Sequence, residues 1–566
     1  MNRLRDSKEN LSRSPSLEVF MLGGVGQFGM NMMALKSGQD SLLVDAGSTL
    51  PGLAHFGIRL MIPDTDNLVS DVGMIHGLVL THGHEDHIGA VPYIWNILKG
   101  NAYGTAITLS LLERKLKEHS IIFDNRLVEI SPGSVFTVGV FKLEFIKVAH
   151  SLPGSVAVAI ETPAGLILHT GDYKMNASRR EADQTDKSRL SEIGAETVLA
   201  MFGDSTNALV SGYTASEEYA YQGLENLFTT ADTRIFVATF SSSLNRIKTL
   251  FELAQIYGRR VFLLGRSLIN NVELAQRLGC LNIPSNLYAD KATLTDCVKK
   301  ESLVILTGSQ GEPHSALHRI ATEEHSSVPL ERGDVVAFSA RVIPGNESRV
   351  GHLVNRLLRR GVKVIQKPEH PIHVSGHGSE EDLKEMLSLV KPRYTIPIHG
   401  EHGQLCHHSE LVGAYSNWNN TALQVQNGDR LCFDSGDVWF GRPIEVGPIY
   451  IDQNHQSCDD GGIALRERRL MAEAGLLVIT VGGLLKNGNG VIQLKVASRG
   501  LTIHTKDADF TERVKECVKA VIASASPSER VDLARLDAEI QGKVRTLFRS
   551  KNRVCPQVLT VFTETL

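Results

Sequence analysis

Thr81-His82-Gly83-His84-Glu85-Asp86-His87 places four potential metal ligands within six residues, directly after an apolar run over residues 75–80. In an extended segment, residues i and i+2 project to the same side, so His82 and His84 can bind one ion through their imidazole nitrogens. A polar cluster this dense after a buried strand needs a ligand to satisfy it. This requirement disfavours the alternative interpretation, a histidine-rich surface loop.

Asp86 and His87 stand at the start of a helix that the apolar spacing predicts over residues 88–98. From that position their side chains can face a second ion beside the first. Asp45 ends another apolar strand and is expected to orient the metal-binding loop from behind the ligands. The stretch therefore predicts a binuclear metal site.

The composition is that of a globular protein with several domains. The 566 residues exceed what one hydrophobic core usually serves, so roughly two to four domains are expected. A hydrophobic fraction of 42% and a charged fraction of 22% suit a folded chain. The formal net charge of -4 does not indicate a strongly basic nucleic-acid binder, so any polyanion site must be a local groove.

The seven cysteines are scattered and contain no C-x-x-C pair. This pattern disfavours a disulfide framework and favours a reducing, cytoplasmic compartment. No apolar run approaches the roughly 20 residues of a membrane span. Residues 1–16 are polar and lack the apolar segment of a signal peptide, so they are expected to form a disordered tail.

The opening segment contains a literal G-x-G-x-x-G from Gly24 to Gly29, which by itself imitates a dinucleotide-binding fingerprint. The turn signal at residues 37–40 leaves little room for a helix between the flanking strands. A hairpin is therefore expected in place of a β-α-β unit, and nucleotide binding is the disfavoured alternative.

Two apolar strands farther along end on candidate ligands, His150 and Asp172. His150 would complete a three-histidine site with His82 and His84. Asp172 can bridge both ions, and it would share the second ion with Asp86 and His87. Each residue alone has a structural alternative, because a lone His or Asp at a strand end is more often structural.

From Asp204 onward, apolar strands alternate with amphipathic helices, which predicts a parallel sheet covered by helices. Two loops at strand ends, residues 238–243 and 307–312, offer hydroxyl and backbone N–H groups that suit phosphate. Ordinary helix N-caps explain these loops nearly as well. A basic segment over residues 350–367 is interpreted as a solvated helix face.

Seven histidines lie between residues 370 and 408. His399 follows an apolar strand and could supply the last ligand of the second ion. His377 stands in a glycine-flanked loop and is a candidate proton or phosphate donor. His407 and His408 lie on a predicted helix and are assigned to the surface or to packing.

Past residue 447 the pattern changes to a small α+β module. Residues 448–470 are expected to form a linker, and residues 471–566 to form strands and two helices. No internal repeat and no extended low-complexity segment is present.

Taken together, these motifs resemble the β-CASP nucleic-acid-processing branch of the metallo-β-lactamase superfamily, and within it the ribonuclease J family. The resemblance spans nearly the whole chain. It is carried by the H-x-H-x-D-H motif at residues 82–87, by His150 and Asp172, and by residues 203–207, 308–313, 343–347, 376–379 and 397–401. The first motif alone would also fit thioesterases or lactamases, whereas the inserted domain and the final pair of histidine motifs would not.

The resemblance implies an α/β architecture. A metallo-β-lactamase αββα sandwich would be formed by residues 17–205 and 370–447. A β-CASP parallel-sheet domain, residues 206–369, would be inserted between them, and a small α+β domain would follow.

The resemblance also implies two Zn²⁺ ions. His82, His84 and His150 would hold one ion. Asp86, His87 and His399 would hold the other, with Asp172 bridging. Asp204 matches the acidic β-CASP motif, and His377 and His399 match the histidine motifs.

The implied activity is zinc-dependent hydrolysis of RNA phosphodiester bonds, as a 5′-to-3′ exonuclease favouring 5′-monophosphate ends, as an endonuclease, or both, in RNA maturation and decay. His377, positioned by Asp204, would stabilise or protonate the leaving oxygen. Asp86 is counted as catalytic because its removal should abolish turnover. Ser241, Ser243, His377 and Ser379 are the candidates for a 5′-phosphate pocket.

The expected partners are single-stranded RNA, further copies of the chain in a dimer or tetramer, and components of an RNA-decay complex, without a membrane. A β-CASP nuclease for DNA repair or RNA 3′-end processing is one alternative, and a non-catalytic RNA-binding scaffold is another. Two departures from the family pattern are Gln27 in place of Glu and His402-Gly403 in place of Tyr-Arg.

Overall fold

Two compact units make up the chain in the computed structural model. The larger comprises Met1–Thr49 and Ile62–Pro448, and the smaller comprises Leu50–Met61 and Ile449–Leu566. The structure describes residues 14–52, 57–66, 68–175, 184–284, 287–325, 328–343, 345–366, 370–416, 418–457, 462–483, 492–501, 508–526, 529–530, 532–549 and 555–563. Within these ranges, no helix combines the length and the hydropathy that a bilayer crossing needs.

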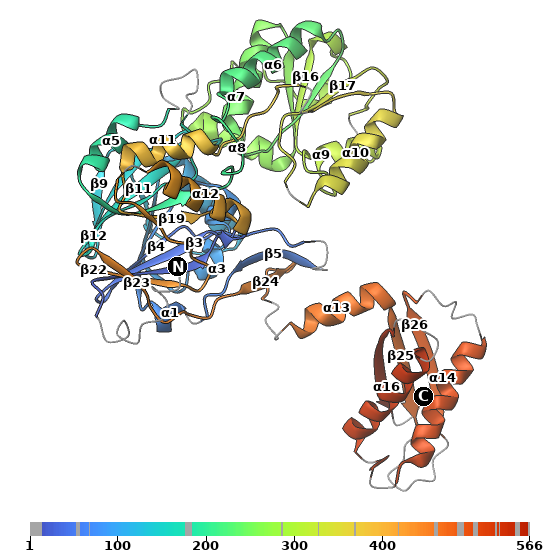
Figure 1. Cartoon of the computed structure of the whole chain (residues 1–566). Coiled ribbons are helices and arrows are strands. Elements are labelled where there is room, and N and C mark those ends of the chain that lie inside the picture. The colour runs from blue at the N-terminus through green and yellow to red at the C-terminus, as the bar shows by residue number, and fades with distance from the viewer. Residues whose placement is uncertain are drawn as a thin grey trace. The chain divides into compact units, whose positions relative to one another are not determined.

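An eight-stranded sheet forms one layer of the larger unit, in the order β23-β22-β1-β3-β4-β6-β7-β8 (Figure 1). Its strands are β1 (Leu17–Gly23), β3 (Met32–Ser37), β4 (Asp40–Val44), β6 (Ile75–Val79), β7 (Leu98–Gly104), β8 (Leu127–Glu129), β22 (Arg430–Asp434) and β23 (Asp437–Phe440). β1, β3 and β4 are antiparallel neighbours, so the predicted hairpin is confirmed and no helix follows the glycine-rich segment.

A seven-stranded sheet forms the second layer, in the order β21-β19-β13-β12-β11-β10-β9. Its strands are β9 (Val135–Val138), β10 (Phe141–Lys147), β11 (Val156–Thr162), β12 (Gly165–His169), β13 (Val198–Asp204), β19 (Tyr394–Ile398) and β21 (Thr421–Ala422). β12, β13 and β19 are parallel, and two antiparallel pairings give β10 the direction of β12. The segments that follow β10, β12, β13 and β19 therefore leave the sheet at the same edge.

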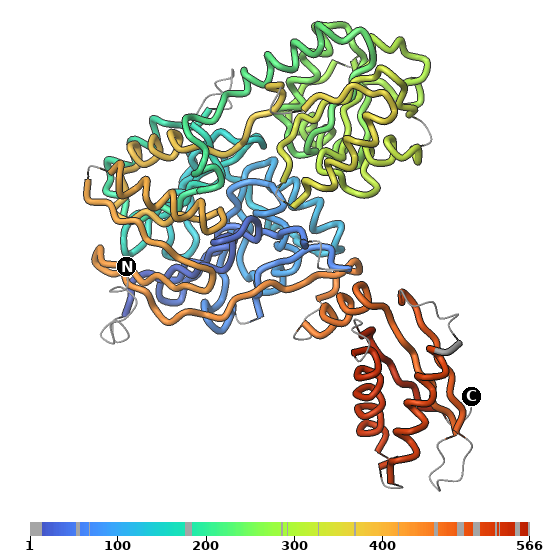
Figure 2. The backbone as a smooth tube through the Cα atoms, turned by 45° about the vertical axis from the view of Figure 1, so that its right-hand side comes forward, coloured from blue at the N-terminus to red at the C-terminus, as the bar shows by residue number. Residues whose placement is uncertain are grey.

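The two sheets pack face to face through one hydrophobic core. Leu35 and Leu42 of the first sheet join Phe145 and Phe202 of the second, and all four side chains are fully buried. On the outer faces lie α4 (Ala106–Glu118), α5 (Lys187–Ala195), α11 (Glu380–Val390) and α12 (His402–Tyr415). Figure 2 shows the returning segment, in orange, beside the blue N-terminal strands. The predicted αββα sandwich is confirmed.

The single helix predicted over residues 88–98 is wrong. The chain forms two short turns instead, α2 (Glu85–Ile88) and α3 (Val91–Ile94), and β7 begins at Leu98. Pro92 has no backbone N–H and can stand only in the first turn of a helix, so it starts a new turn rather than continuing the old one. The spacing of the apolar residues alone does not predict this break.

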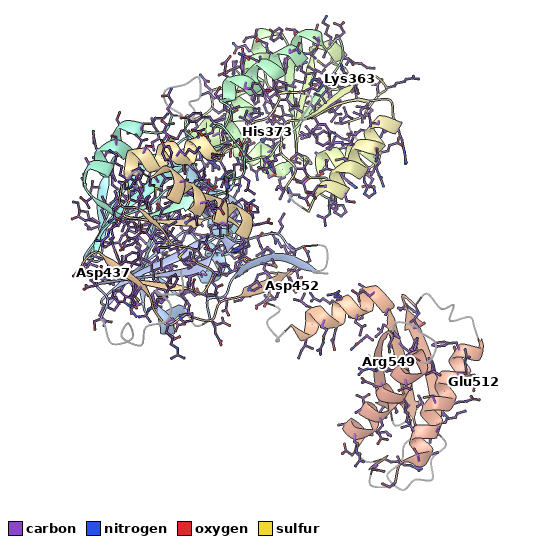
Figure 3. The ribbon with its side chains drawn as sticks, in the orientation of Figure 1. Lys363, His373, Asp437, Asp452, Glu512 and Arg549 are labelled. Carbon is purple, nitrogen blue, oxygen red and sulfur yellow. The ribbon has the colours of Figure 1, made fainter. Side chains whose placement is uncertain are left out.

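The predicted β-CASP sheet is also confirmed, and it is entirely parallel, in the order β15-β16-β14-β17-β18. Its strands are β14 (Ile235–Ala238), β15 (Arg260–Leu264), β16 (Ser302–Leu306), β17 (Val335–Phe338) and β18 (Lys363–Ile365). The helices are α6 (Glu217–Thr230), α7 (Leu244–Ile256), α8 (Arg266–Arg277), α9 (Ala316–Ala321) and α10 (Glu347–Arg359). Lys363 starts the edge strand, and His373 lies in the segment that returns to the sandwich (Figure 3).

The smaller unit has its own sheet, β26-β25-β27, and its own core. Its elements are most of β5 (Ile58–Pro63) and of β24 (Pro448–Asp452), and all of α13 (Ile463–Ala474), β25 (Leu476–Gly482), β26 (Gln493–Arg499), α14 (Ala508–Ser524), α16 (Leu533–Arg549) and β27 (Gln557–Thr563). Residues 448–470 were expected to be a linker, but they contain β24 and most of α13. The expected tail, residues 1–16, lies outside the described residues up to residue 13, and Ser16 already donates a hydrogen bond to Phe433 O.

Candidate metal centre

Loops at strand ends bring seven His and Asp side chains together at one edge of the sandwich. They are His82 and His84 after β6, Asp86 and His87 in α2, His150 after β10, Asp172 after β12 and His399 after β19. His87 and His399 stand 312 residues apart in the sequence, yet their Nε2 atoms are 3.3 Å apart. The sheet topology explains this approach, because β10, β12 and β19 all end at the same edge.

Three of the histidines form the first donor group. His84 Nδ1 lies 3.0 Å from His82 Nε2 and 3.2 Å from His150 Nε2. Asp172 Oδ2 lies 3.5 Å from His82 Nε2 and 3.7 Å from His150 Nε2. Ligand atoms about 2.0–2.1 Å from a tetrahedral ion are separated by roughly 3.3 Å, so this set fits one ion.

The second donor group consists of Asp86, His87 and His399. His399 Nε2 lies 3.3 Å from Asp86 Oδ2, and His87 Nε2 lies 3.6 Å from the same oxygen. Asp172 Oδ1 lies 3.3 Å from His87 Nε2 and 3.5 Å from His399 Nε2. Each carboxylate oxygen of Asp172 thus faces a different donor group, which is the arrangement of a bridging ligand.

The first donor group is electrostatically ready for a cation. Burial lowers the pKa of His82 and His150 well below the usual value, and it also lowers the pKa of His84. These imidazoles are therefore neutral at neutral pH, and a metal ion needs the lone pair of the neutral ring.

In the second donor group, carboxylates favour the positively charged form of the two histidines. Burial alone would lower the pKa of His87 and His399, but Asp172 and neighbouring carboxylates raise it, to about 9 for His399. Burial would raise the pKa of Asp172, but the surrounding imidazolium groups lower it. The buried carboxylates thus require positive charge, which either protons or a metal ion can supply.

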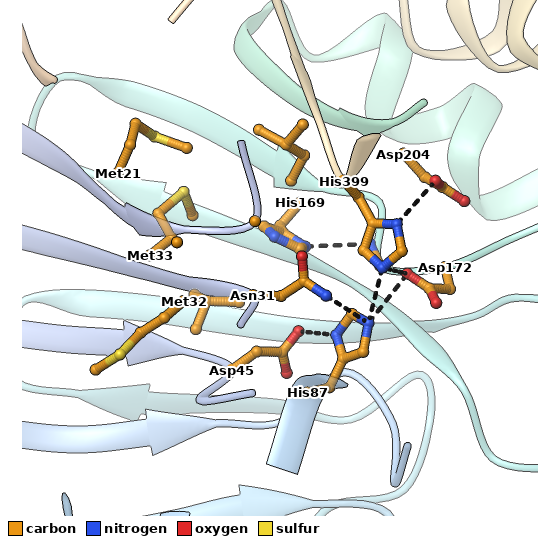
Figure 4. Close-up of a pocket in the computed structure, with 15 residues that line it drawn as sticks. Met21, Asn31, Met32, Met33, Asp45, His87, His169, Asp172, Asp204 and His399 are labelled. Carbon is orange, nitrogen blue, oxygen red and sulfur yellow. Dashed lines mark hydrogen bonds and ion pairs between the residues drawn. The ribbon is translucent and has the colours of Figure 1, made fainter. Parts of the chain in front are cut away.

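Asp45 supports this centre from behind, as Figure 4 shows. Its carboxylate accepts hydrogen bonds from Thr81 N and Thr81 Oγ1, both at 2.8 Å, and lies 2.7 Å from His87 Nδ1. The contact on Nδ1 leaves His87 Nε2 facing Asp172. Asn31, which the sequence analysis missed, donates through Nδ2 to Asp86 O at 3.0 Å. No motif marks Asn31, because its role depends on the packing of β3 against α2.

His377 and Asp204 stand beside the two donor groups. His377 Nδ1 lies 2.9 Å from Asp204 Oδ2, and 21% of the His377 side chain is exposed. Burial would lower the pKa of His377, but Asp204 and Asp172 raise it, so the protonated form is favoured. Thr206, which lies in the 203–207 motif but had no assigned role, links the groups, because its Oγ1 donates to Asp204 Oδ1 at 2.7 Å and lies 2.7 Å from His399 Nδ1.

Family models match most of the chain. The metallo-β-lactamase superfamily matches residues 25–212, and the β-CASP domain of ribonuclease J matches residues 232–357. A zinc-dependent metallo-hydrolase RNA specificity domain matches residues 362–423, and the ribonuclease J C-terminal domain matches residues 463–565.

Relatives match over nearly the full length. Ribonuclease J2 of Bacillus subtilis is 31% identical, over 97% of this chain and 99% of the relative. The chain belongs to the ribonuclease J family. Ribonuclease J of Thermus thermophilus is 35% identical over 91% of this chain and 90% of the relative, and that of Helicobacter pylori is 31% identical over 98% and 80%.

A solved structure of an Enterococcus faecalis protein of unknown function has a TM-score of 0.53 at 15% identity, over 74% of this chain and 100% of that chain. This likeness concerns the fold alone. Membership of the metallo-β-lactamase superfamily implies the use of a divalent metal, and the two donor groups could bind one.

The serines predicted for a 5′-phosphate pocket of this ribonuclease J family member differ in burial and in hydrogen bonding. Ser241 and Ser243 lie half-buried just before α7, whose Asn245 donates through Nδ2 to His150 O at 3.4 Å. Ser379 is buried, and its hydroxyl caps α11 and lies 2.8 Å from Thr214 Oγ1. Its hydroxyl therefore has a structural role in this structure.

The two departures from the ribonuclease J pattern lie close together. β2 (Val25–Gly26) pairs with β20 (Gly400–Glu401), and Gln27 forms a further bridge to Gly400. Gln27 and His402 thus flank the same short ladder beside His399. His407 is half-exposed, whereas His408 is buried with Nδ1 2.9 Å from Ser205 Oγ, and burial lowers the pKa of His408 to about 4.

Proposed function

We propose that this chain hydrolyses RNA phosphodiester bonds as a metal-dependent ribonuclease with two Zn²⁺ ions as cofactors. The family supports the class of enzyme. The proposal of two ions rests on one observation: the two carboxylate oxygens of Asp172 face separate donor groups. His82, His84 and His150 hold one ion, and Asp86, His87 and His399 hold the other. Divalent ions bound there lower the pKa of water to near neutrality and neutralise phosphate charge.

His377 supplies the proton for the leaving oxygen in this proposal. Its protonated form is favoured by Asp204, which also fixes the ring through the 2.9 Å contact with Nδ1. The other nitrogen, Nε2, is then the one that can donate to substrate. Asp45 and Thr206 act indirectly, by orienting His87 and His399.

For the substrate end, we propose 5′-to-3′ exonuclease action that favours a 5′-monophosphate, with endonuclease action at the same centre. Ser241, Ser243 and His377 form the pocket for the terminal phosphate, and Ser379 holds the loop that carries His377. The position of Asn245 against His150 O supports this placement, because it brings the loop before α7 to the metal centre.

Digestion of 3′-labelled RNA tests the activity and its direction together. Matched strands carry either a 5′-monophosphate or a 5′-triphosphate, and a DNA strand of the same sequence reports other nuclease specificities. Faster loss of the monophosphate strand is expected, with labelled fragments that shorten from the 5′ end. The Asp86→Ala variant should be inactive but folded. Equal rates on both RNA ends would contradict the pocket, and full activity of Asp86→Ala would contradict the centre.

We further propose a cytoplasmic homo-oligomer, a dimer or tetramer, that works with other RNA-decay proteins. The smaller unit carries a core of its own, and the six described cysteines form no disulfide, which suits a reducing compartment. Light scattering of the purified chain measures its mass in solution, and a monomer at micromolar concentration would contradict the oligomer.

A further inference from the structure

An arginine that the proposed mechanism does not use stands beside the loop of His377. Arg341 follows β17 at the carboxyl edge of the parallel sheet. Its Nη1 donates to Asn207 Oδ1 at 2.8 Å. Asn207 is buried, and its Nδ2 donates to Ser375 Oγ at 2.9 Å and to His377 O at 3.1 Å. One amide thus ties the guanidinium to the backbone of His377.

The backbone of Arg341 is held as firmly as its side chain. Gln310 Nε2 donates to Arg341 O at 2.8 Å, and Gln310 Oε1 accepts from Ile343 N at 2.8 Å. Gln310 is 3% exposed, so this contact is shielded from water. Arg341 is therefore fixed before any ligand arrives, which reduces the conformational entropy that binding must cost.

The charge of Arg341 is not neutralised within the part of the chain that the structure describes. Arg341 is exposed, and no described carboxylate lies within 4.0 Å of its guanidinium. Asn207 takes one of the five guanidinium N–H donors, and no second acceptor for this guanidinium is found among the described residues. Such a fork matches the geometry of a phosphate group, and the chain's net charge of -4 leaves RNA attraction to local cations of this kind.

We infer that Arg341 is a substrate-positioning residue whose guanidinium binds a phosphate group of single-stranded RNA next to His377. This inference rests on the proposed ribonuclease function and adds a specific anchor to it. His377 is partly exposed, so a strand held by Arg341 can present a neighbouring bond to the His377 ring. The link through Asn207 keeps the phosphate anchor and the proton donor in a constant relation.

The test compares Arg341→Gln and Arg341→Lys with Arg356→Gln, a surface control on α10. Binding of 3′-fluorescein single-stranded RNA is measured by anisotropy in EDTA over a series of NaCl concentrations, and kcat/KM is measured with metal present. Arg341→Gln should weaken binding and kcat/KM by about 10-fold. It should also reduce the slope of log Kd against log salt by about 0.7, the value for one lost phosphate contact.

Arg341→Lys keeps the charge and should restore the salt slope while recovering only part of the affinity, because an ammonium cannot form the planar fork. If Arg341→Gln matched Arg356→Gln in affinity and slope, the inference would be overturned. Equal losses in both Arg341 variants with an unchanged slope would also overturn it, since they would indicate a structural role. Failure of the wild-type chain to cleave RNA would contradict the proposed function. RNA binding measured in EDTA tests the role of Arg341 independently of cleavage.

Discussion

At the scale of single residues, buried carboxylates organise the centre more than the histidines do. Asp172 and Asp45 each contact groups that come from different segments, and both are almost fully buried. A buried carboxylate is stable only when donors or cations surround it, so each one draws the surrounding loops into a fixed arrangement. Asp45 holds the far nitrogen of His87 in this way, whereas Thr206 Oγ1 contacts that of His399 and Gly376 O contacts that of His150.

Asp45 provides a test of that role. Asp45→Asn removes the negative charge that fixes the tautomer of His87, so metal affinity should fall by roughly 10- to 100-fold while the fold persists. Competition with a chelator of known affinity measures the change, and Asp437→Asn, an exposed carboxylate on β23, serves as the control. Unchanged affinity in Asp45→Asn would show that Asp45 does not support the centre.

His377 is expected to act in the chemical step rather than in metal binding. His377→Gln removes the proton donor, so kcat should fall by roughly 10²- to 10⁴-fold with metal content unchanged. Single-turnover kinetics and metal analysis on the same sample separate the two effects. His352→Gln, on the exposed side of α10, is the matched control. Loss of bound metal together with activity would instead make His377 a ligand.

At the scale of elements, the N-terminus of α11 joins three segments that surround the site. Asp382 is fully buried in the first turn. Its Oδ1 accepts from Met175 N at 2.7 Å, and its Oδ2 accepts from Thr214 N at 2.7 Å and Ser379 N at 3.0 Å. The helix thereby fixes the ends of the loops that carry Asp172 and His377, and the helix dipole favours the same charge.

Asp382→Ala leaves three buried N–H groups without acceptors and should lower the free energy of unfolding by about 3 kcal/mol. Asp382→Asn keeps one acceptor oxygen, so its free energy of unfolding should fall by less than that of Asp382→Ala. Urea unfolding measures both, with Glu381→Gln on the same turn as the control for helix charge. A difference below about 1 kcal/mol between Asp382→Ala and the control would contradict the role of this cap.

At the scale of the larger unit, a buried ionic network joins the inserted sheet domain to the sandwich. Glu217, in the first turn of α6, lies 2.7 Å from Arg246 Nη2 and 3.3 Å from Lys174 Nζ. Lys174 Nζ donates to Ser375 O at 3.1 Å, and Arg246 Nη1 donates to Ser339 Oγ at 2.6 Å. The two chain segments that connect the inserted sheet domain to the sandwich are therefore held by the same ionic network.

This network makes stability depend on acid pH. Burial would raise the pKa of Glu217 from 4.5, but Arg246 and Lys174 lower it to about 2. A lowered pKa contributes stability that is complete above about pH 4.5 and is lost as the pH falls toward about 2. Glu217→Gln should therefore lower the free energy of unfolding by about 3 kcal/mol at pH 7.

The difference between Glu217→Gln and the wild type should narrow as the pH falls from about 5 to about 3. Urea unfolding at a series of pH values measures it, and Glu410→Gln, exposed on α12, controls for the lost carboxylate. A difference that stays constant with pH would show that Glu217 is not ionised in the folded chain.

Much of this organisation could be predicted from the sequence. Alternating strands and helices indicated the parallel sheet, since each element must bury one apolar face and the spacing of that face is local. The types of ligand residue were equally visible, because few other chemistries need H-x-H-x-D-H after a buried strand. The break at Pro92 does not follow from the spacing of apolar residues, which is helical throughout residues 88–98.

Only the tertiary structure decided which side chains meet. The sequence by itself determined the candidate donors and the strands that precede them. The pairing of β13 with β19 brings His399 back beside His87, and that pairing depends on the whole sandwich core. Thr206 and Asn207 lie in a motif that carries the family resemblance, but the sequence assigns no contact to them or to Arg341, because hydrogen bonds between distant segments exist only after the sheets have packed.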